Sequence, residues 1–448
     1  MKIVIAGIGE VGSHLAKMLG NGDHDIVVID PVDERIKSLA EYADLISIEG
    51  ASTSISTLLK AGVDKADLFI AVNPSEDQDM NITSAILAKK LGAKKVVARI
   101  NTDEYLIPEN KDMFTDIGID HLLYPEKIAA KAIIDLLRQT GTTEYIDFAG
   151  GKLQIVVTRL EDGAPILDRT LRDVTNQYCS LNYRAIAINR DGEVIIPGKD
   201  EEFKLHDMVY VISTHEGIPE VLKYTGKTNI DVNNIMIFGG SPIGVMLAKE
   251  LEDKINVKLI DSNKDKSFEL ATELKNTLVI NADIRNTDAM MEEDLANMDA
   301  VVALTPSSET NILACLAAKK AGVKKTIAEI ENIDYIKLAE SVGIDTAINK
   351  KIIAAGRIFR YTIDSDVQSI KYLTGSDAEI LEFIAKPNSP VTRTKVRNLN
   401  FPKTAIMGGI IRGSQAYIIT GETEIKPYDR VVVFSLPQMV NKLGKYFT

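Results

Sequence analysis

Residues 2–19 read KIVIAGIGEVGSHLAKML, and residues 234–251 read NIMIFGGSPIGVMLAKEL. Each stretch combines an apolar strand, a glycine-rich turn and the first turns of a helix, which is the phosphate-binding opening of a dinucleotide-binding fold. Gly7 and Gly12 of the first stretch recur as Gly239 and Gly244 of the second. Two such units in tandem favour an assembly that senses a ligand over an enzyme with a single substrate.

The repeat extends well beyond these motifs. Residues 66–100 and 298–330 align over a strand, a helix and a second strand, with Asn81 matching Asn311. In both copies short apolar strands alternate with helical stretches. This alternation predicts a parallel sheet with helices on both of its faces.

A smaller, β-rich segment follows each copy, with hairpin turns at 190–192 and 412–414. The predicted fold class is therefore α/β, with two Rossmann-like, doubly wound parallel-sheet domains that are each followed by a small α+β domain. The predicted domains span residues 1–140, 141–226, 232–358 and 365–448.

A helix is predicted from Pro125 to Arg138, and its counterpart lies near 351–361. The first of these helices carries one apolar stripe, formed by Ile128, Ala132, Ile133, Leu136 and Leu137. Each helix either packs on its own domain or crosses over to a partner domain, and the sequence leaves both possibilities open.

Composition excludes several classes of function. The formal net charge of −12 argues against non-specific binding of nucleic acid and against direct docking on anionic lipid. Two cysteines, Cys179 and Cys315, are too few for a disulfide framework and suit a reducing cytosol. No apolar run approaches the thickness of a bilayer, so we expect no membrane-spanning segment and no signal peptide. The scattered histidines predict no metal site.

The first glycine loop predicts a nucleotide site. Gly7 permits the tight turn, Gly9 lets the backbone approach a pyrophosphate, and Gly12 allows close packing of helix on strand. Free N–H groups at the start of the helix then face the phosphates. Asp30 ends the second strand, where a carboxylate accepts hydrogen bonds from ribose hydroxyls and favours NAD over NADP. The loop also contributes Ile8, Glu10 and Val11.

Other candidates in the first copy follow later strands. Ser52 comes after the third strand and either borders the adenine or belongs to an ordinary turn. Asn73 and Pro74 end the fourth strand, at the sheet edge where open α/β folds bind ligands. Arg99 lies in an apolar strand, where its charge meets either a phosphate, including that of a neighbouring subunit, or a buried acid.

The second copy departs from this pattern. Ser241 stands at the position of Gly9, so that a phosphate bound there would meet a Cβ. Glu329 stands at the position of Arg99, so that the phosphate would also meet a repulsive charge. Asp261 remains, and Asp283 lies where it could reach a ribose or an adenine amine. A weaker second site and a scaffold without a ligand both remain open. The candidate residues of this copy are Phe238, Gly239, Gly240, Ser241, Pro242, Asp261 and Asp283.

Residues for catalysis do not form a recognisable group. The sequence has no histidine with a carboxylate to orient it, no G-x-S-x-G, no zinc spacing and no Walker lysine. We therefore expect a protein that is not an enzyme. An NAD-dependent oxidoreductase and a nucleotide-sensing regulator of another cation channel or antiporter are the alternatives. The paired lysines of AKKLGAKK and AKKAGVKK are predicted to form solvated helix ends.

These motifs resemble the TrkA family of cytosolic regulators of Trk-type potassium uptake, built from RCK (also called KTN) domains. The resemblance covers essentially the whole chain, with Ser241 replacing a glycine that is common in the family. It implies NAD(H) as ligand with ATP and ADP as alternatives, and a homotetrameric ring. It also implies a potassium-translocating membrane subunit as partner, and a cytoplasmic location at the inner face of the membrane. Followed residue by residue, the family's contacts fall on Gly7 to Val11, Asp30, Asn73, Pro74, Arg99, Phe238 to Pro242 and Asp261.

Overall fold

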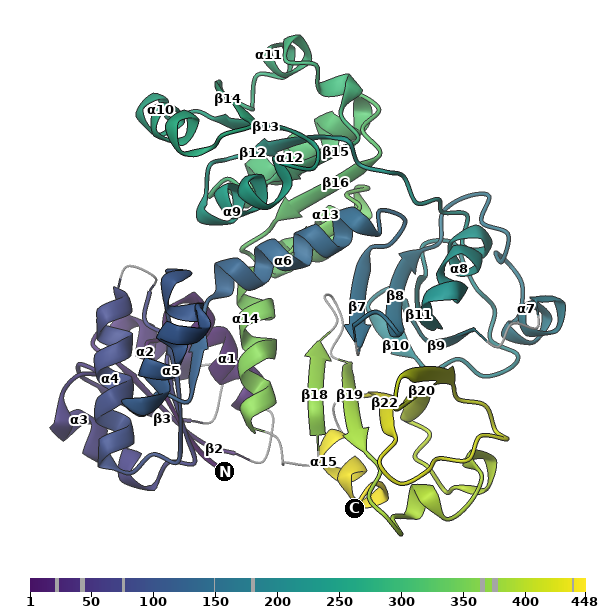
Figure 1. Ribbon diagram of the computed structural model, residues 1–448, viewed down its shortest axis with the longest axis horizontal. Coiled ribbons are helices and arrows are strands. Elements are labelled where there is room, and N and C mark those ends of the chain that lie inside the picture. Colours follow the sequence, from purple (N-terminus) through teal and green to yellow (C-terminus); the bar gives the residue numbers. More distant parts are fainter. Residues whose placement is uncertain are drawn as a thin grey trace. The chain divides into compact units, whose positions relative to one another are not determined.

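The computed structural model, shown in Figure 1, describes nine stretches of the chain. They are residues 1–20, 24–40, 45–74, 77–148, 150–178, 182–362, 367–372, 378–436 and 439–448. The chain divides into two compact units, one formed by Met1–Ala129 with Asn349–Ile363 and the other by Ala130–Ile348 with Asp364–Thr448.

The first repeat forms a six-stranded parallel sheet in the order β3-β2-β1-β4-β5-β6. This is the strand order of a Rossmann fold. Its strands are β1 (Lys2–Ala6), β2 (Asp25–Asp30), β3 (Ile46–Glu49), β4 (Leu68–Ala71), β5 (Lys95–Arg99) and β6 (His121–Leu123). Its helices are α1 (Glu10–Gly20), α2 (Asp33–Ala40), α3 (Ile55–Lys60), α4 (Gln78–Leu91) and α5 (Pro108–Asp116), and α6 (Pro125–Arg138) follows.

The second repeat has the same topology, with the order β14-β13-β12-β15-β16-β17. Its strands are β12 (Asn234–Phe238), β13 (Asn256–Asp261), β14 (Thr277–Asn281), β15 (Ala300–Ala303), β16 (Lys325–Glu329) and β17 (Thr346–Ile348). Its helices are α9 (Pro242–Leu251), α10 (Lys264–Glu273), α11 (Thr287–Glu292), α12 (Ser308–Lys320) and α13 (Asp334–Ser341), and α14 (Lys350–Phe359) follows.

An antiparallel five-stranded sheet follows each parallel one, in the orders β10-β9-β11-β8-β7 and β18-β19-β22-β20-β21. The first contains β7 (Glu144–Phe148), β8 (Leu153–Arg159), β9 (Tyr183–Arg190), β10 (Glu193–Ile195) and β11 (Met208–Thr214), with α7 (Leu171–Tyr178) and α8 (Ile218–Tyr224). The second contains β18 (Val367–Tyr372), β19 (Glu379–Ile384), β20 (Ala405–Arg412), β21 (Gln415–Ile418) and β22 (Arg430–Ser435), with α15 (Val440–Leu443). The predicted fold class is confirmed.

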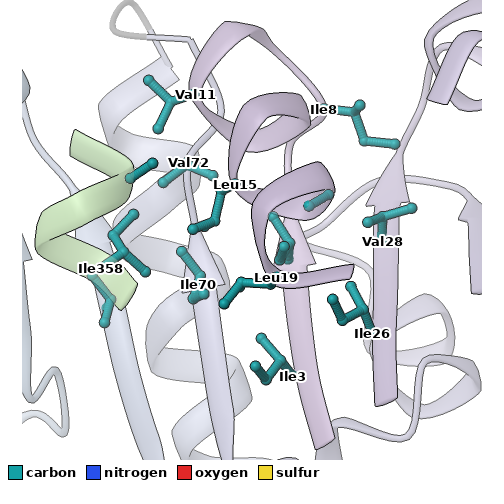
Figure 2. Packing of buried hydrophobic residues seen from close by; sticks show 14 of the residues in the cluster. Ile3, Ile8, Val11, Leu15, Leu19, Ile26, Val28, Ile70, Val72 and Ile358 are labelled. Carbon is teal, nitrogen blue, oxygen red and sulfur yellow. The ribbon is translucent and has the colours of Figure 1, made fainter. Parts of the chain in front are cut away.

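The parallel sheet of the first repeat is buried on both faces at its centre, because residues 3–6 of β1 and all of β4 are apolar at successive positions. Ile3 and Ile5 of β1 point into one cluster with α1, and Val4 and Ala6 point into another with α3 and α4. Figure 2 shows the first cluster, with Leu15 of α1 lying over the strands. A continuous apolar run rather than an alternating one is typical of a covered parallel sheet.

Helix α14 follows the second repeat in sequence but packs on the first. Its residues Ala354, Ala355 and Ile358 are fully buried in the cluster around α1, and Figure 2 shows Ile358 beside this core. Just beyond the helix, the Tyr361 ring stacks on His121 with centroids 4.0 Å apart. The crossover alternative is therefore correct for this helix.

The two antiparallel sheets share one core. Ile155 and Tyr210 from the first sheet lie in the same cluster as Ile380 and Phe434 from the second. The Tyr210 and Phe434 ring centroids are 6.0 Å apart. Gly409 of β20 allows this approach, because a Cβ there would lie 2.7 Å from a methyl group of Leu153.

We expect Ile358→Ala to destabilise the first unit by about 2–4 kcal/mol, because it removes a fully buried side chain and leaves a cavity. Arg357→Ala, on the exposed side of the same helix, should change stability by no more than about 0.5 kcal/mol. Native-state hydrogen exchange of the β1 amides measures this unit separately. Equal protection in the two variants would contradict the packing of α14 on this domain.

Candidate functional site

Gly7 and Gly12 in the first glycine loop are required by the chain's own packing. Gly7 has a φ of +96°, and a Cβ there would lie 2.6 Å from the backbone N of Asn73. A Cβ on Gly12 would lie 1.9 Å from the carbonyl oxygen of Gly7. These two glycines therefore shape the turn whether or not a ligand is bound.

Gly9 is different, because nothing in the described structure demands a glycine there. A Cβ at this position would meet only the Pro74 ring, at 3.9 Å and beyond. Its carbonyl oxygen accepts the Ser13 N–H at 2.9 Å and so belongs to the first turn of α1. The space beside Gly9 thus lies open at the start of α1, where a backbone without a Cβ suits a pyrophosphate.

The Asp30 carboxylate connects the glycine loop to the end of β2. Asp30 is 1% exposed; its Oδ2 accepts the Ile8 N–H at 2.6 Å, and its Oδ1 accepts the Val32 N–H at 2.9 Å. Arg35 approaches the same carboxylate at 3.6 Å. The carboxylate therefore already has a structural role, and its predicted contact with a ribose stays a prediction.

Ser52 and Asn73 lie together in a buried polar network that also includes Asn81. The Asn73 side-chain amide donates to Ser52 Oγ at 3.3 Å and to Asn81 Oδ1 at 3.0 Å. Asn81 Oδ1 also accepts the backbone N–H of Asn73 at 2.8 Å. Asn81 was not among the predicted site residues, although its recurrence as Asn311 was the available signal. In the second repeat Asn311 likewise accepts the Thr305 N–H, at 2.9 Å.

Arg99 forms a buried ion pair with Glu126, which is the buried-acid alternative of the sequence analysis. Arg99 Nη2 lies 2.8 Å from Glu126 Oε1, and both residues are 8% exposed. Within the described residues Arg99 Nε and Glu126 Oε2 have no hydrogen-bond partner. The Arg99 guanidinium therefore already has a carboxylate partner, and its contact with a phosphate stays a prediction.

The glycine loop of the second repeat repeats the scheme of the first. Gly239 has a φ of +98°, and a Cβ there would lie 2.8 Å from the Leu304 carbonyl oxygen. The Asp261 carboxylate accepts the Gly240 N–H and the Asn263 N–H, each at 2.8 Å. The backbone of a dinucleotide-type loop is therefore present in both copies.

The space that Gly9 leaves open in the first repeat is filled in the second. Ser241 carries a Cβ, and its Oγ accepts the Gly244 N–H at 3.3 Å as the N-cap of α9, which begins at Pro242. The neighbouring Gly240 is also crowded, because a Cβ there would lie 2.4 Å from a Leu270 methyl group. One helix N–H group is thus already satisfied within the chain.

Asp283 follows the end of β14 by two residues and has a charged partner of its own. Its Oδ2 accepts from Arg285 Nη2 at 2.7 Å, and this hydrogen bond lowers the pKa of the carboxyl to about 2. Glu329 is buried at the end of β16, as Arg99 is at the end of β5. The predicted contacts of Asp283 and Phe238 with a ligand stay predictions.

Two observations concern the described part of the chain as a whole. None of its helices is both long enough and apolar enough to cross a bilayer. Its His, Cys, Asp and Glu side chains do not form any group of three or more that could hold a metal ion.

We expect Gly7→Ala to lower the free energy of unfolding by more than about 2 kcal/mol, because the substitution combines a positive φ with a backbone clash. Gly9→Ala should cost at most about 1 kcal/mol, since its Cβ meets open space. Hydrogen exchange of the β1 and β4 amides reports both changes. The interpretation fails if the two variants are equally destabilised.

Comparison with known proteins identifies the domains. The TrkA-N domain model matches residues 3–125 and 235–350, and the TrkA-C domain model matches residues 155–226 and 380–448. The Trk system potassium uptake protein TrkA homolog of Archaeoglobus fulgidus is 30% identical over 452 residues, covering 100% of both chains. The Trk system potassium uptake protein TrkA of Vibrio alginolyticus is 30% identical, covering 99% of this chain and 96% of its own.

Solved structures share the fold. The GsuK RCK domain superposes with a TM-score of 0.60 at 16% identity, covering 100% of this chain and 94% of that one. The GsuK channel bound to NAD superposes with a TM-score of 0.61 at 15% identity, covering 100% and 78%. With TrkA-N and TrkA-C domains in tandem and curated relatives that match it from end to end, the chain belongs to the TrkA family.

Proposed function

We propose that this protein is the nucleotide-sensing regulatory subunit of a Trk-type potassium uptake system. The full-length match to proteins named for that system supports the proposal. The open space beside Gly9 is the observation on which the sensing role depends. In this proposal the protein regulates transport and is not an enzyme.

The first repeat is the proposed ligand site, for NAD(H) or alternatively ATP or ADP. The pyrophosphate would lie against the loop from Gly7 to Gly12, with the ribose at Asp30 and the adenine near Ser52. Asn73 and Pro74 would border the ligand across the sheet edge, and Arg99 would come within reach of a phosphate. GsuK, a structural neighbour with the same fold, has been solved with NAD bound.

The second repeat is proposed as a weaker site. Ser241 Oγ already accepts a helix N–H that would otherwise be available to a phosphate oxygen. A ligand would have to displace this cap and fit against a Cβ. The two repeats of one chain would therefore respond to different nucleotide concentrations.

A ligand can act only through its different affinities for two conformations of the assembly. The loop that would hold the ligand leads directly into α1, against which α14 packs. Helix α14 follows β17 after a single residue, Asn349, so the chain links α1 to the second repeat. A shift of α1 would reach the second repeat by this route.

The proposed assembly is a homotetrameric ring in the cytoplasm, bound beneath a potassium-translocating membrane subunit. The proposed domains remain 1–140, 141–226, 232–358 and 365–448. Ligand-dependent change in the ring would hold the membrane subunit open or shut through contacts between the proteins.

Gly9→Val tests the ligand site. We expect it to raise the dissociation constant for NAD by about tenfold or more, because its side chain would enter the space of the pyrophosphate. Gly198→Val is the matched control, since that glycine has no atom within 4 Å of its Cβ position and no positive φ. Isothermal titration calorimetry measures both. Unchanged affinity in Gly9→Val would refute the site.

Reconstitution tests the regulatory role. With the Trk-type membrane subunit of the same organism in liposomes, potassium flux should change on addition of NAD(H), ATP or ADP. The Gly9→Val protein should still bind the membrane subunit but lose this response. Flux that does not depend on nucleotide, while both proteins remain bound, would contradict the proposal.

A further inference from the structure

A polar cavity of about 400 Å³ lies within the second compact unit, away from both glycine loops. It is lined by two connecting segments, 140–143 and 226–230, by β8 with the segment before β11, and by the turns after α12 and α13. It therefore lies where the first TrkA-C domain meets the second TrkA-N domain.

The two connecting segments are joined to each other by hydrogen bonds. Thr140 Oγ1 accepts the Ile230 N–H at 2.8 Å, and the Gly141 N–H donates to Asn229 Oδ1 at 3.0 Å. These bonds hold one wall of the cavity in a defined conformation. This wall of the cavity is thus formed by two segments that are hydrogen-bonded to each other.

Lys325 is a buried cation in the cavity wall. It is 1% exposed, and its Nζ donates to the Thr142 carbonyl oxygen at 2.6 Å and to Thr346 Oγ1 at 3.2 Å. An ammonium group has three donors, and within the described residues only two of those of Lys325 have a partner. Its counterpart in the first repeat, Lys95, is exposed. The prediction that these paired lysines are solvated is therefore wrong for Lys325.

Positive charge exceeds negative charge around the cavity. Lys227 pairs with Glu161 at 2.6 Å, and Lys319 forms a close ion pair with Asp345. The remaining charged groups in the lining are Arg159, Lys324, Lys325 and one carboxylate, Glu340.

Lys324 has no ion-pair partner among the described residues, and Arg159 donates to the backbone carbonyl oxygen of Glu340. In a chain of net charge −12, this is a local excess of cations around a polar cavity.

We propose that this cavity binds a small, multiply charged oxyanion of the phosphate type. Lys325 would donate its third hydrogen bond to the anion, and Lys324 and Arg159 would balance the remaining charge. Charge-assisted hydrogen bonds of this kind are about twice as strong as neutral ones. The bound anion would bridge the second TrkA-N domain and the first TrkA-C domain, independently of the nucleotide site in the first repeat.

Binding of an anion beside Lys325 should be accompanied by uptake of protons by this lysine. Burial lowers the pKa of its ammonium to about 8; Asp345 opposes this shift, and Lys319 and Lys227 add to it. A bound anion favours the charged form, so binding near pH 8 should take up about half a proton.

Titration with inorganic pyrophosphate tests the proposal, against sodium chloride of matched ionic strength. The full chain carrying Gly9→Val is used, so that the first glycine loop does not contribute. We expect Lys324→Glu to weaken binding by about tenfold or more, because it reverses a charge at the cavity. Lys95→Glu, an exposed lysine of the first repeat, is the matched control and should bind as the parent does.

The Lys325→Met variant provides a second readout. In the parent protein at pH 8, the measured enthalpy should vary with the ionisation enthalpy of the buffer, and in Lys325→Met the proton uptake derived from this variation should fall by about half a proton. Circular dichroism establishes that the variant is folded; if it is not, Lys324→Glu decides alone. Absence of pyrophosphate binding, or equal affinity in Lys324→Glu and Lys95→Glu, would overturn the proposal.

Discussion

The hydrogen bond from Ile8 N–H to the buried Asp30 carboxylate, at 2.6 Å, holds the glycine loop against the end of β2. The equivalent bond joins Gly240 to Asp261 in the second repeat at 2.8 Å, which shows that the constraint belongs to the fold and not to one copy. Because the loop is held here, Gly7 lies so close to the Asn73 backbone that a Cβ at this position would clash with it. What remains free is the space beside Gly9. The Asp30 carboxylate therefore shapes the candidate site through its hydrogen bond to the loop, whether or not a ligand is bound.

Interlocking of the two repeats has a different physical basis, which is burial of apolar surface. Ile358 of α14 is fully buried in the core of the first repeat although the helix follows the second repeat in sequence. The two antiparallel sheets similarly share a core that neither completes alone. Each antiparallel sheet also contains the same bidentate ion pair, formed by Arg190 with Asp207 in the first sheet and by Arg412 with Asp429 in the second. The duplicated sequence thus yields equivalent local contacts and a chain whose halves depend on each other.

Much of the fold and part of the site follow from the sequence. The glycine spacing and the acid at the end of the second strand are local features, so both loops and both carboxylates could be predicted. Other features depend on residues distant in sequence. Arg99 pairs with Glu126 because β5 and the start of α6 converge, and Asn81 serves Asn73 because α4 begins beside the end of β4. Ser241, which stands in the second loop at the position of Gly9, caps α9 in the structure, and the weaker ligand binding expected of this loop stays a prediction.

The sequence by itself determined the duplication, the parallel-sheet fold and the location of the glycine loops, because these depend on the local pattern of strand, turn and helix. Only the tertiary structure decided which helix packs on which domain and which charges are buried. Lys95 and Lys325 occupy equivalent positions in nearly identical motifs. Lys95 is exposed, whereas Lys325 is buried, with only 1% of its surface exposed. The difference arises because a residue's burial depends on what packs against it. In the second repeat, the segment leading into the first TrkA-C domain covers this position, with the Thr142 carbonyl oxygen 2.6 Å from the lysine Nζ.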